Sequence, residues 1–512
     1  MSVILLALPG YLPFTLILLA VLCLIRAKAA NPQKGSAIGH DYLITPVSVS
    51  QQIPVLGHLL HYVKEGSSYF TQLCQSTKLP IFTIWIGTAK VTLIQPELAK
   101  YLPKLKNVGL NPLALDMFQK SLGFGKLSST LLREADEASR QVGKHASRMF
   151  REEFIPGVRL RYYAETVDGY IQADLKQIST QDINIEDWIF KCLVGAVGKV
   201  IWGANDGPFH DESFLSHLRH FLLNVRALNN PATWFIDKSL LESRRIVRER
   251  LTQLSPQEPQ DEKSDDGFLN RIRRLCQSHG APAEGWTDYQ LLLIAGLGPN
   301  IMSATTWYVY HILHDQHLLD SVRREIDIAL AGSDDKDGTM DLSEISQTCP
   351  LLHATWLEVL RFHGTFLAGR YVREDTTLAD TYFLPKGSYA LAPLRPHHFD
   401  PEIWGDDADQ FRPGRFLKDG KLDPEAQRKL RVFGLFGTVC PGRFLATNMA
   451  ITVAIRLFST LDLAPRPGEE FVLPGERKDT VVGMATPDRE VVMRVARRAG
   501  VVERKVRMAW KS

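Results

Sequence analysis

The sequence predicts an α+β fold that is mainly helical, and three features of the chain support this. Two short apolar segments near the start, PIFTIWIG and KVTLIQP, alternate and break in the manner of paired strands. Helical periodicity dominates from about residue 130 to about residue 330. Strand patterns return after about Gly364, mixed with further helices, and EVVMRV is the last of them. Strand segments at both ends of a helix-rich body indicate that sheets and helices are segregated along the chain.

The composition of the 512 residues is that of an ordinary globular protein, with 45% hydrophobic and 23% charged residues. The length alone suggests several domains, but proline, glycine and charge never divide the chain into blocks of different composition. A net charge of +3 argues against nucleic acid as the main partner. The six cysteines show no paired spacing, which is typical of isolated thiols in a reducing compartment.

The N-terminus carries an apolar run that predicts a transmembrane helix. Residues 3–25, VILLALPGYLPFTLILLAVLCLI, contain no charged side chain and would span about 35 Å as a helix, against ~30 Å for a hydrocarbon core. Arg26, Lys28 and Lys34 follow directly, which places the rest of the chain on the cytosolic side. A cleaved signal peptide is the alternative, but the run exceeds an h-region and no positive segment precedes it. We therefore expect a single-pass anchor at 3–25 and a linker at 26–52.

One cysteine lies between a turn and a predicted helix. The segment FGLFGTVCPGRFLA contains Cys440, with Gly437 and Gly442 expected to supply unusual backbone angles, and a long helical pattern follows. Unpaired N–H groups and the dipole at a helix start stabilise negative charge, which predicts a lowered pKa for this thiol. A thiolate beside Phe433, in an apolar wall, suits a soft metal ligand that is shielded from water. The alternative is a buried structural cysteine.

The spacing of Phe433, Cys440, Gly442 and Ala446 resembles the heme-binding loop of the cytochrome P450 family, Phe-x-x-Gly-x-x-x-Cys-x-Gly-x-x-x-Ala. The resemblance implies that the cofactor is heme b and that Cys440 is the axial thiolate ligand of its iron. By the same resemblance Phe433 and Gly442 belong to the heme-binding site.

Two positions of this loop depart from the family pattern. Phe436 occupies the position of a glycine, and Thr438 that of a basic residue that pairs with a heme propionate in many members. Arg370, in LAGRYVRED, matches the propionate-binding arginine of the family and is expected to supply that contact. Lys144 and Arg148 are weaker candidates for the same role.

A Glu-x-x-Arg pair supports the resemblance. Glu358 and Arg361 stand three residues apart on one helix face in TWLEVLRF, although Glu242 and Arg245 show the same spacing by chance. The segment PEIWGDDADQFRPGRF follows and is similar to the family's meander. The resemblance implies that Arg415 joins Glu358 and Arg361 in a buried ion network, and the alternative is three surface charges.

A nearly all-apolar segment, TDYQLLLIAGLGPNIMSATTWYVYHILHD, predicts a helix through the core that begins at a Thr287 cap. Pro299 removes one intrahelical bond and clashes with the carbonyl of Ala295, and Gly296 and Gly298 relax the same turn. We therefore expect a break in this helix that leaves room for a small ligand.

The resemblance places the oxygen-binding groove at this break, where family members usually carry an acidic residue followed by threonine. Here those positions hold Pro299 and Asn300. Asn300, with Trp307 downstream, resembles the branch that contains sterol 7α-hydroxylases and prostacyclin synthase. Asn300 is therefore the candidate catalytic residue, because its amide can hydrogen-bond an oxygen or a chain of water molecules. Its alternative role is to satisfy the carbonyl that Pro299 frees.

The resemblance covers roughly residues 53–498. It implies a single heme-thiolate catalytic domain at 53–512, on the cytosolic side, in a monooxygenase of the endoplasmic reticulum membrane. The chain has no flavin or nicotinamide fingerprint, so the electrons are expected from an NADPH-dependent reductase that docks near Arg428, Lys429 and Arg431. The substrate is expected to be lipophilic, such as a sterol, a terpenoid or another polycyclic lipid. Four segments that line the pocket in similar proteins are apolar here, namely NVGLNPLALDMFQKSLGF, FLLNVRALNNPATWF, GTFLAG and VVGMAT.

Two rival functions stay open at this point. A heme-thiolate isomerase or dehydratase that acts on a peroxide without a reductase is favoured by the missing acid–alcohol pair. A heme-binding sensor or carrier would show no turnover.

Overall fold

The computed structural model describes the chain in the following ranges: 43–49, 57–77, 79–87, 89–105, 108–109, 119–125, 137–203, 207–229, 233, 237–254, 267–278, 283–332, 339–341, 344–434, 439–478, 483–499 and 507–509. The predicted anchor at 3–25 and most of the predicted linker lie outside these ranges. Within them, no helix is both long enough and apolar enough to cross a membrane.

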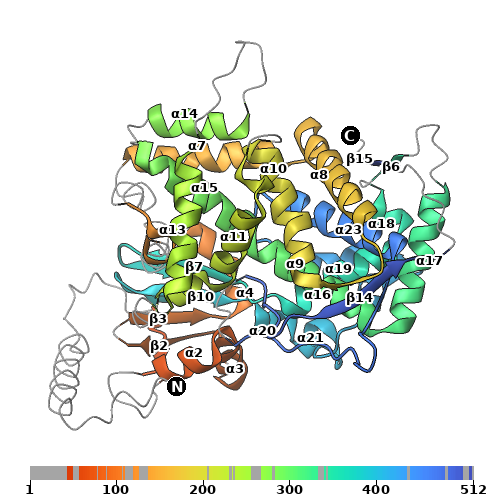
Figure 1. The fold of residues 1–512 in the computed structure, drawn as a ribbon. Coiled ribbons are helices and arrows are strands. Elements are labelled where there is room, and N and C mark those ends of the chain that lie inside the picture. The colour runs from red at the N-terminus through yellow and green to blue at the C-terminus, as the bar shows by residue number, and fades with distance from the viewer. Residues whose placement is uncertain are drawn as a thin grey trace, which may run out of the picture.

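A six-stranded mixed sheet occupies one end of the molecule, beside α2 and α3 (Figure 1). Both strand segments expected near the start are confirmed, because PIFTIWIG and KVTLIQP form its antiparallel strands β2 and β3. Strand β10 pairs parallel to β3 and antiparallel to β7, so the sheet joins the start of the chain to its last third. In order across the sheet its strands are β1 (Val47–Ser48), β2 (Ile81–Ile86), β3 (Ala89–Ile94), β10 (Tyr389–Pro393), β7 (Leu367–Val372) and β4 (Val108–Gly109).

The remaining strands form small sheets. EVVMRV lies in β14, which is the central strand of a three-stranded antiparallel sheet. The small sheets are β13 (Leu461–Ala464) with β14 (Val492–Arg497) and β5 (Gln181–Asn184), β8 (Thr376–Leu378) with β9 (Tyr382–Leu384), β11 (Leu417–Lys418) with β12 (Lys421–Leu422), and β15 (Arg507–Ala509) with β6 (Thr339–Asp341).

Helices make up the rest of the described fold. The longer ones are α2 (Leu59–Glu65), α3 (Ser67–Thr77), α7 (Glu137–Phe154), α8 (Val158–Gln177), α9 (Ile185–Phe190), α10 (Ala196–Trp202), α11 (Glu212–Asn224), α13 (Lys238–Thr252), α14 (Phe268–Ser278), α15 (Ala283–Leu297), α16 (Pro299–His314), α17 (Gln316–Gly332), α19 (Pro350–His363) and α23 (Arg443–Thr460). The short turns are α4 (Pro96–Ala99), η2 (Leu102–Lys104), η3 (Gln119–Gly123), η4 (Lys191–Gly195), η5 (Pro208–His210), η6 (Val225–Asn229), α18 (Ile345–Thr348), α20 (Arg395–His398), α21 (Pro401–Trp404), η7 (Pro413–Phe416) and α22 (Pro424–Lys429).

The main hydrophobic core lies among these helices, and α16, α19 and α23 are at its centre (Figure 1). Helix α16 is buried from Met302 to Ile312, on all of its sides, as its apolar sequence predicts. Smaller clusters cover the two faces of the six-stranded sheet. A mainly helical α+β fold is therefore confirmed.

The core helix breaks where Pro299 predicts it. Helix α15 ends at Leu297, Gly298 intervenes, and α16 begins at Pro299, which cannot donate to the preceding turn. The expected start at Thr287 is wrong, because α15 begins at Ala283. The hydroxyl of Thr287 lies inside α15, at 2.9 Å from that of Thr252 on α13.

Candidate active site

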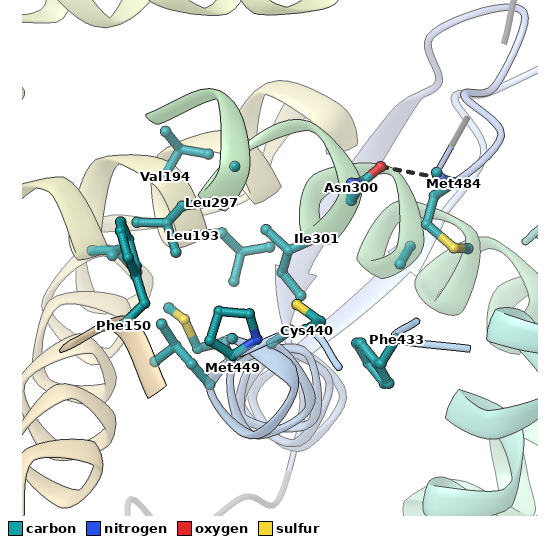
Figure 2. Close-up of a pocket in the computed structure, with 18 of the residues that line it drawn as sticks. Phe150, Leu193, Val194, Leu297, Asn300, Ile301, Phe433, Cys440, Met449 and Met484 are labelled. Atoms are coloured by element: carbon teal, nitrogen blue, oxygen red, sulfur yellow. Dashed lines mark hydrogen bonds between the residues drawn. The ribbon is translucent and has the colours of Figure 1, made fainter. Parts of the chain in front are cut away.

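A cavity of about 570 Å³ lies between the break of the core helix, the Cys440 loop and the start of α23 (Figure 2). Its walls are almost entirely apolar. Among the described residues that line it, Arg151 and Cys440 carry the ionisable side chains and Asn300 carries a neutral amide. The volume and the lining are typical of a site for a sizeable apolar ligand.

The loop before α23 is closed by a backbone hydrogen bond that Cys440 N–H donates to the carbonyl of Phe433 at 2.6 Å. Phe433 and Gly434 take left-handed backbone angles, with φ of 58° and 96°. A left-handed phenylalanine is uncommon and is retained only where its surroundings fix it. The departures at Phe436 and Thr438, and Gly437 between them, lie outside the described residues.

Gly442 does not need the backbone freedom expected of it, since its φ of −82° is open to any residue. A Cβ atom at this position would lie 3.9 Å from Cys440 Sγ, which is ordinary contact. The unusual turn angles of the described loop belong to Phe433 and Gly434 instead.

The thiol of Cys440 is the accessible one among the four free cysteines whose surroundings are described, and Cys74, Cys192 and Cys349 are buried. Burial of the sulfur by its neighbours raises the pKa of Cys440, and the N–H of Gly442 and the charge of Arg443 oppose this only in part. The predicted lowering of this pKa is therefore wrong for the protein alone. A metal cation deprotonates a thiol that coordinates it, so a bound iron reverses the direction.

These residues fit a heme. Nowhere in the described part of the chain do three His, Cys, Asp or Glu side chains gather as a set of metal ligands. The cavity offers one accessible thiol between apolar walls. A single protein sulfur suits an iron whose other ligands come from a flat apolar macrocycle, and a cysteine thiolate is one of the recognised axial ligands of heme.

Two arginines are available for the carboxylates that a heme carries. Arg370 is half-buried on β7, where Nη1 donates to the carbonyl of Gly369 at 2.8 Å, and burial lowers its pKa. Within the described residues it makes no ion pair and does not reach the cavity wall. Arg151, in the last turn of α7, does line the cavity. Arg151 was not predicted from the sequence, where its one signal is that it follows Arg148 on the same predicted helix. Arg148 itself is exposed and does not line the cavity.

The buried ion network is confirmed. Glu358 and Arg361 are fully buried, and two hydrogen bonds of 2.7 and 2.8 Å join them. Arg415 Nε donates to the same carboxylate at 2.9 Å. Arg361 also donates to the carbonyl of Ala408 at 2.8 Å, so the network ties α19 to the segment that leads to the Cys440 loop. The alternative of three surface charges is wrong.

Asn300 lines the cavity from the first turn of α16, and its side-chain oxygen accepts a hydrogen bond from the backbone N–H of Met484 at 3.1 Å (Figure 2). An oxygen atom cannot donate a hydrogen bond to a carbonyl, and within the described residues the amide N–H groups of Asn300 make no hydrogen bond to the carbonyl of Ala295. The alternative role, satisfying the carbonyl that Pro299 frees, is therefore not found. Gly483 lies against this amide with φ of 108°, where a Cβ would come within 2.2 Å of Asn300 Oδ1.

Side chains behind the cavity hold the neighbours of Met484 as well. Trp307 Nε1 donates to the carbonyl of Ala485 at 2.8 Å, and Thr365 Oγ1 donates to that of Gly483 at 3.0 Å. Phe366, Gly483 and Met484 line the cavity. This confirms that the segments GTFLAG and VVGMAT contribute to the pocket, whereas residues 110–118 of another expected segment lie outside the described ranges.

One accessible thiol under a broken core helix, with apolar walls, defines a heme-thiolate oxidoreductase. The family model of cytochrome P450 matches residues 289–493. A cytochrome P450 monooxygenase of Gibberella zeae is 24% identical over 79% of this chain and 78% of its own length. Cytochrome P450 monooxygenase nodJ of Hypoxylon pulicicidum is 23% identical over 88% and 90%, and cytochrome P450 7B1 of Mus musculus is 25% identical over 90% of each chain. The match over residues 289–493 and the similarity to these monooxygenases support a cytochrome P450 enzyme, and this domain implies a heme whose iron is held by a cysteine thiolate.

Proposed function

We propose that this protein is a membrane-anchored monooxygenase for a lipophilic substrate, with Cys440 as the thiolate ligand of its heme. The observation that carries the proposal is the single accessible thiol at the start of α23, on an apolar cavity of about 570 Å³. The substrate class that we propose is a sterol, a terpenoid or another polycyclic lipid, because such molecules match walls that have almost no polar group.

When bound, the heme supplies the activation of dioxygen and the insertion of one oxygen atom into the substrate. The residues of the chain would bind and orient the heme and the substrate, and would shield them from water. Cys440 would hold the iron, with Phe433 and Gly442 in the same loop. Arg151, which lines the cavity, and Arg370, which lies outside its wall, are the residues that would pair with the propionates. The apolar walls exclude bulk water, so the polar groups that remain act in a medium of low dielectric constant.

We propose that Asn300 serves the reaction with its amide nitrogen. Its oxygen is engaged by the N–H of Met484, which fixes the orientation of the amide. The two N–H donors can then hold a water molecule at the helix break, and that water molecule can relay a proton into the cavity. Family members usually carry an acidic residue and a threonine at positions 299 and 300. Asn300 is a candidate to supply the proton delivery of that pair.

The cellular setting of the proposal follows from the sequence. Residues 3–25 anchor the protein in the endoplasmic reticulum membrane, 26–52 link the anchor to the body, and 53–512 form one cytosolic catalytic domain. Members of this family receive electrons from a reductase. We place its docking surface beside the Cys440 loop, where Arg428 and Lys429 are exposed at the end of α22.

A second candidate is an isomerase or dehydratase that rearranges a peroxide without a reductase. The observation that favours it is the absence of an acid and an alcohol at Pro299 and Asn300. The two candidates differ in their need for electrons. Only a monooxygenase consumes NADPH, through a reductase, in proportion to product.

Two measurements test the proposal. The reduced protein with carbon monoxide should show the red-shifted Soret band of a thiolate-ligated heme, and Cys440→Ser should abolish it while Cys74→Ser, at a buried thiol, keeps it. Retention of that band in Cys440→Ser would remove Cys440 as the ligand. Mass analysis of candidate lipids incubated with reductase, NADPH and ¹⁸O₂ should then show one labelled oxygen atom in the product. An unlabelled product formed without NADPH would favour the isomerase.

A further inference from the structure

One end of the cavity is closed by an aromatic wall that belongs to none of the segments expected to bind substrate. Figure 2 shows Phe150, Leu193 and Val194 on the side of the cavity away from Phe433 and Met484. On that side, η4 and α10 contribute apolar lining residues. The lining residues of this end, in chain order, are Phe150, Leu193, Val194, Val197, Gly198, Trp202 and Phe209.

The depth of this end is set by a contact between Gly198 and Phe209. A Cβ atom at position 198 would lie 1.9 Å from Phe209 Cδ1 and 2.3 Å from two more atoms of the ring. The ring of Phe209 therefore lies against the bare backbone of α10. Any side chain at position 198 must push this ring out of its place.

The wall is also fixed from behind. Trp202 packs against Phe209 with ring centroids 5.1 Å apart, and Phe209 meets Phe214 edge to face at 5.3 Å. Trp202 Nε1 donates to Gln290 Oε1 at 2.8 Å, and Gln290 Nε2 donates in turn to the carbonyl of Leu251 at 3.2 Å. The one polar group of the wall is thus already satisfied inside the protein.

We infer that this end of the cavity is a substrate subsite, closed by Gly198, Trp202 and Phe209, that accepts only an unsubstituted alkyl or aryl end of the substrate. The inference rests on the proposed function and specifies its substrate class further. A hydroxyl placed between Gly198, Trp202 and Phe209 would lose its water and find no hydrogen-bond partner on these three side chains, because the indole N–H is taken by Gln290.

A series of 1-alkylimidazoles, from butyl to dodecyl, measures the depth of this subsite. The imidazole nitrogen ligates a heme iron and shifts its Soret band, and the alkyl chain extends into the cavity. Each buried methylene should tighten binding about fourfold, the equivalent of ~0.8 kcal/mol, until the chain meets the wall. The chain length at which affinity stops rising is the quantity to compare between variants.

Three variants make the comparison. Gly198→Ala should stop the rise at a shorter chain, because the displaced ring fills the end of the cavity. Phe209→Leu should extend the rise to a longer chain. Gly195→Ala is the matched control on the same helical run, since a Cβ there would meet Leu215 at an ordinary 3.8 Å. It should behave like the wild type.

The outcomes separate the subsite from the proposed function. The same limiting chain length in all four proteins would overturn the subsite while leaving the heme site intact. Loss of heme in Gly198→Ala with retention in Gly195→Ala would also overturn it, since this end would then hold the edge of the heme. Absence of any Soret shift in the wild type would overturn the heme site itself, and the subsite with it. If Gly198→Ala fails to fold, the limit in Phe209→Leu decides.

Discussion

At the scale of single residues, Asn300 combines two roles that substitution can separate. Its oxygen holds Met484 N–H, and its amide nitrogen is the proposed donor in the cavity. We expect Asn300→Leu to lose both, and to lower the product formed per NADPH by up to roughly a hundredfold, the lower end of what a positioned acid or base contributes. The missing electrons should appear as hydrogen peroxide. NADPH, product and peroxide are measured together under saturating substrate.

Asn300→Asp separates the two roles, because it keeps the acceptor for Met484 and removes the amide donors. If the donors matter, the Asp variant should lose coupling nearly as far as the Leu variant, with its thiolate Soret band unchanged. Normal coupling in the Asp variant together with poor coupling in the Leu variant would reduce Asn300 to an anchor for the Gly483–Met484 turn.

At the scale of elements, the Glu358–Arg361–Arg415 network joins α19 to the segment before the Cys440 loop. Glu358→Ala leaves two buried guanidinium groups without their carboxylate, at a typical cost of ~3–5 kcal/mol. We expect lower heme content and a lower Tm, rather than slower turnover alone. Glu242→Ala is the control, because Glu242 and Arg245 share the same spacing but are about half exposed, and an exposed ion pair contributes little to stability. Equal Tm values in the two variants would contradict a buried network.

A second connection between elements predicts how stability depends on pH. His363 Nδ1 lies 2.8 Å from Glu476 Oε1, and His363 Nε2 lies 2.8 Å from His311 Nε2. Burial lowers the pKa of both histidines below the usual 6.5. Burial alone would raise the pKa of Glu476, but His363 and Arg395 outweigh it and lower this pKa from 4.5 to about 2.

All three shifts act in the same direction. Below pH 6.5 the two histidines are protonated in the unfolded chain but stay neutral in the folded protein. Between pH 4.5 and 2 Glu476 is likewise protonated in the unfolded chain but ionised in the folded protein. We therefore expect Tm to fall steadily as the pH drops from about 6.5 toward 2. Glu476→Gln should cost about 1–3 kcal/mol at pH 7 and flatten the fall below pH 4.5. A Gln variant with the wild-type Tm profile would contradict this assignment.

At the scale of the whole molecule, short-range patterns predicted elements well and long-range contacts poorly. Pro299 located the helix break because its effect is local, and β2, β3 and β14 followed from alternation. The bond between Asn300 and Met484 joins positions 184 residues apart, and no local pattern contains it. Gly198 reads in the sequence as a helix glycine until Phe209 is placed against it. The raised pKa of Cys440 has the same origin, since desolvation depends on neighbours that only the fold brings together.

The last prediction concerns how the whole chain meets a membrane. Deleting residues 1–28 should release most of the protein from membranes with its heme in place, because within the described residues no helix is able to span a bilayer. The body still exposes apolar side chains near the start of its described part, with Ile44 at 52%, Val47 at 60% and Leu60 at 50% exposure. We expect these side chains to bind a membrane weakly, because a small apolar area gives limited membrane affinity by itself. Flotation on liposomes should therefore recover a minor fraction of the truncated protein, and serine at all three positions should remove it. Full membrane retention of the truncated protein with serine at all three positions would mean that the anchor lies outside residues 3–25.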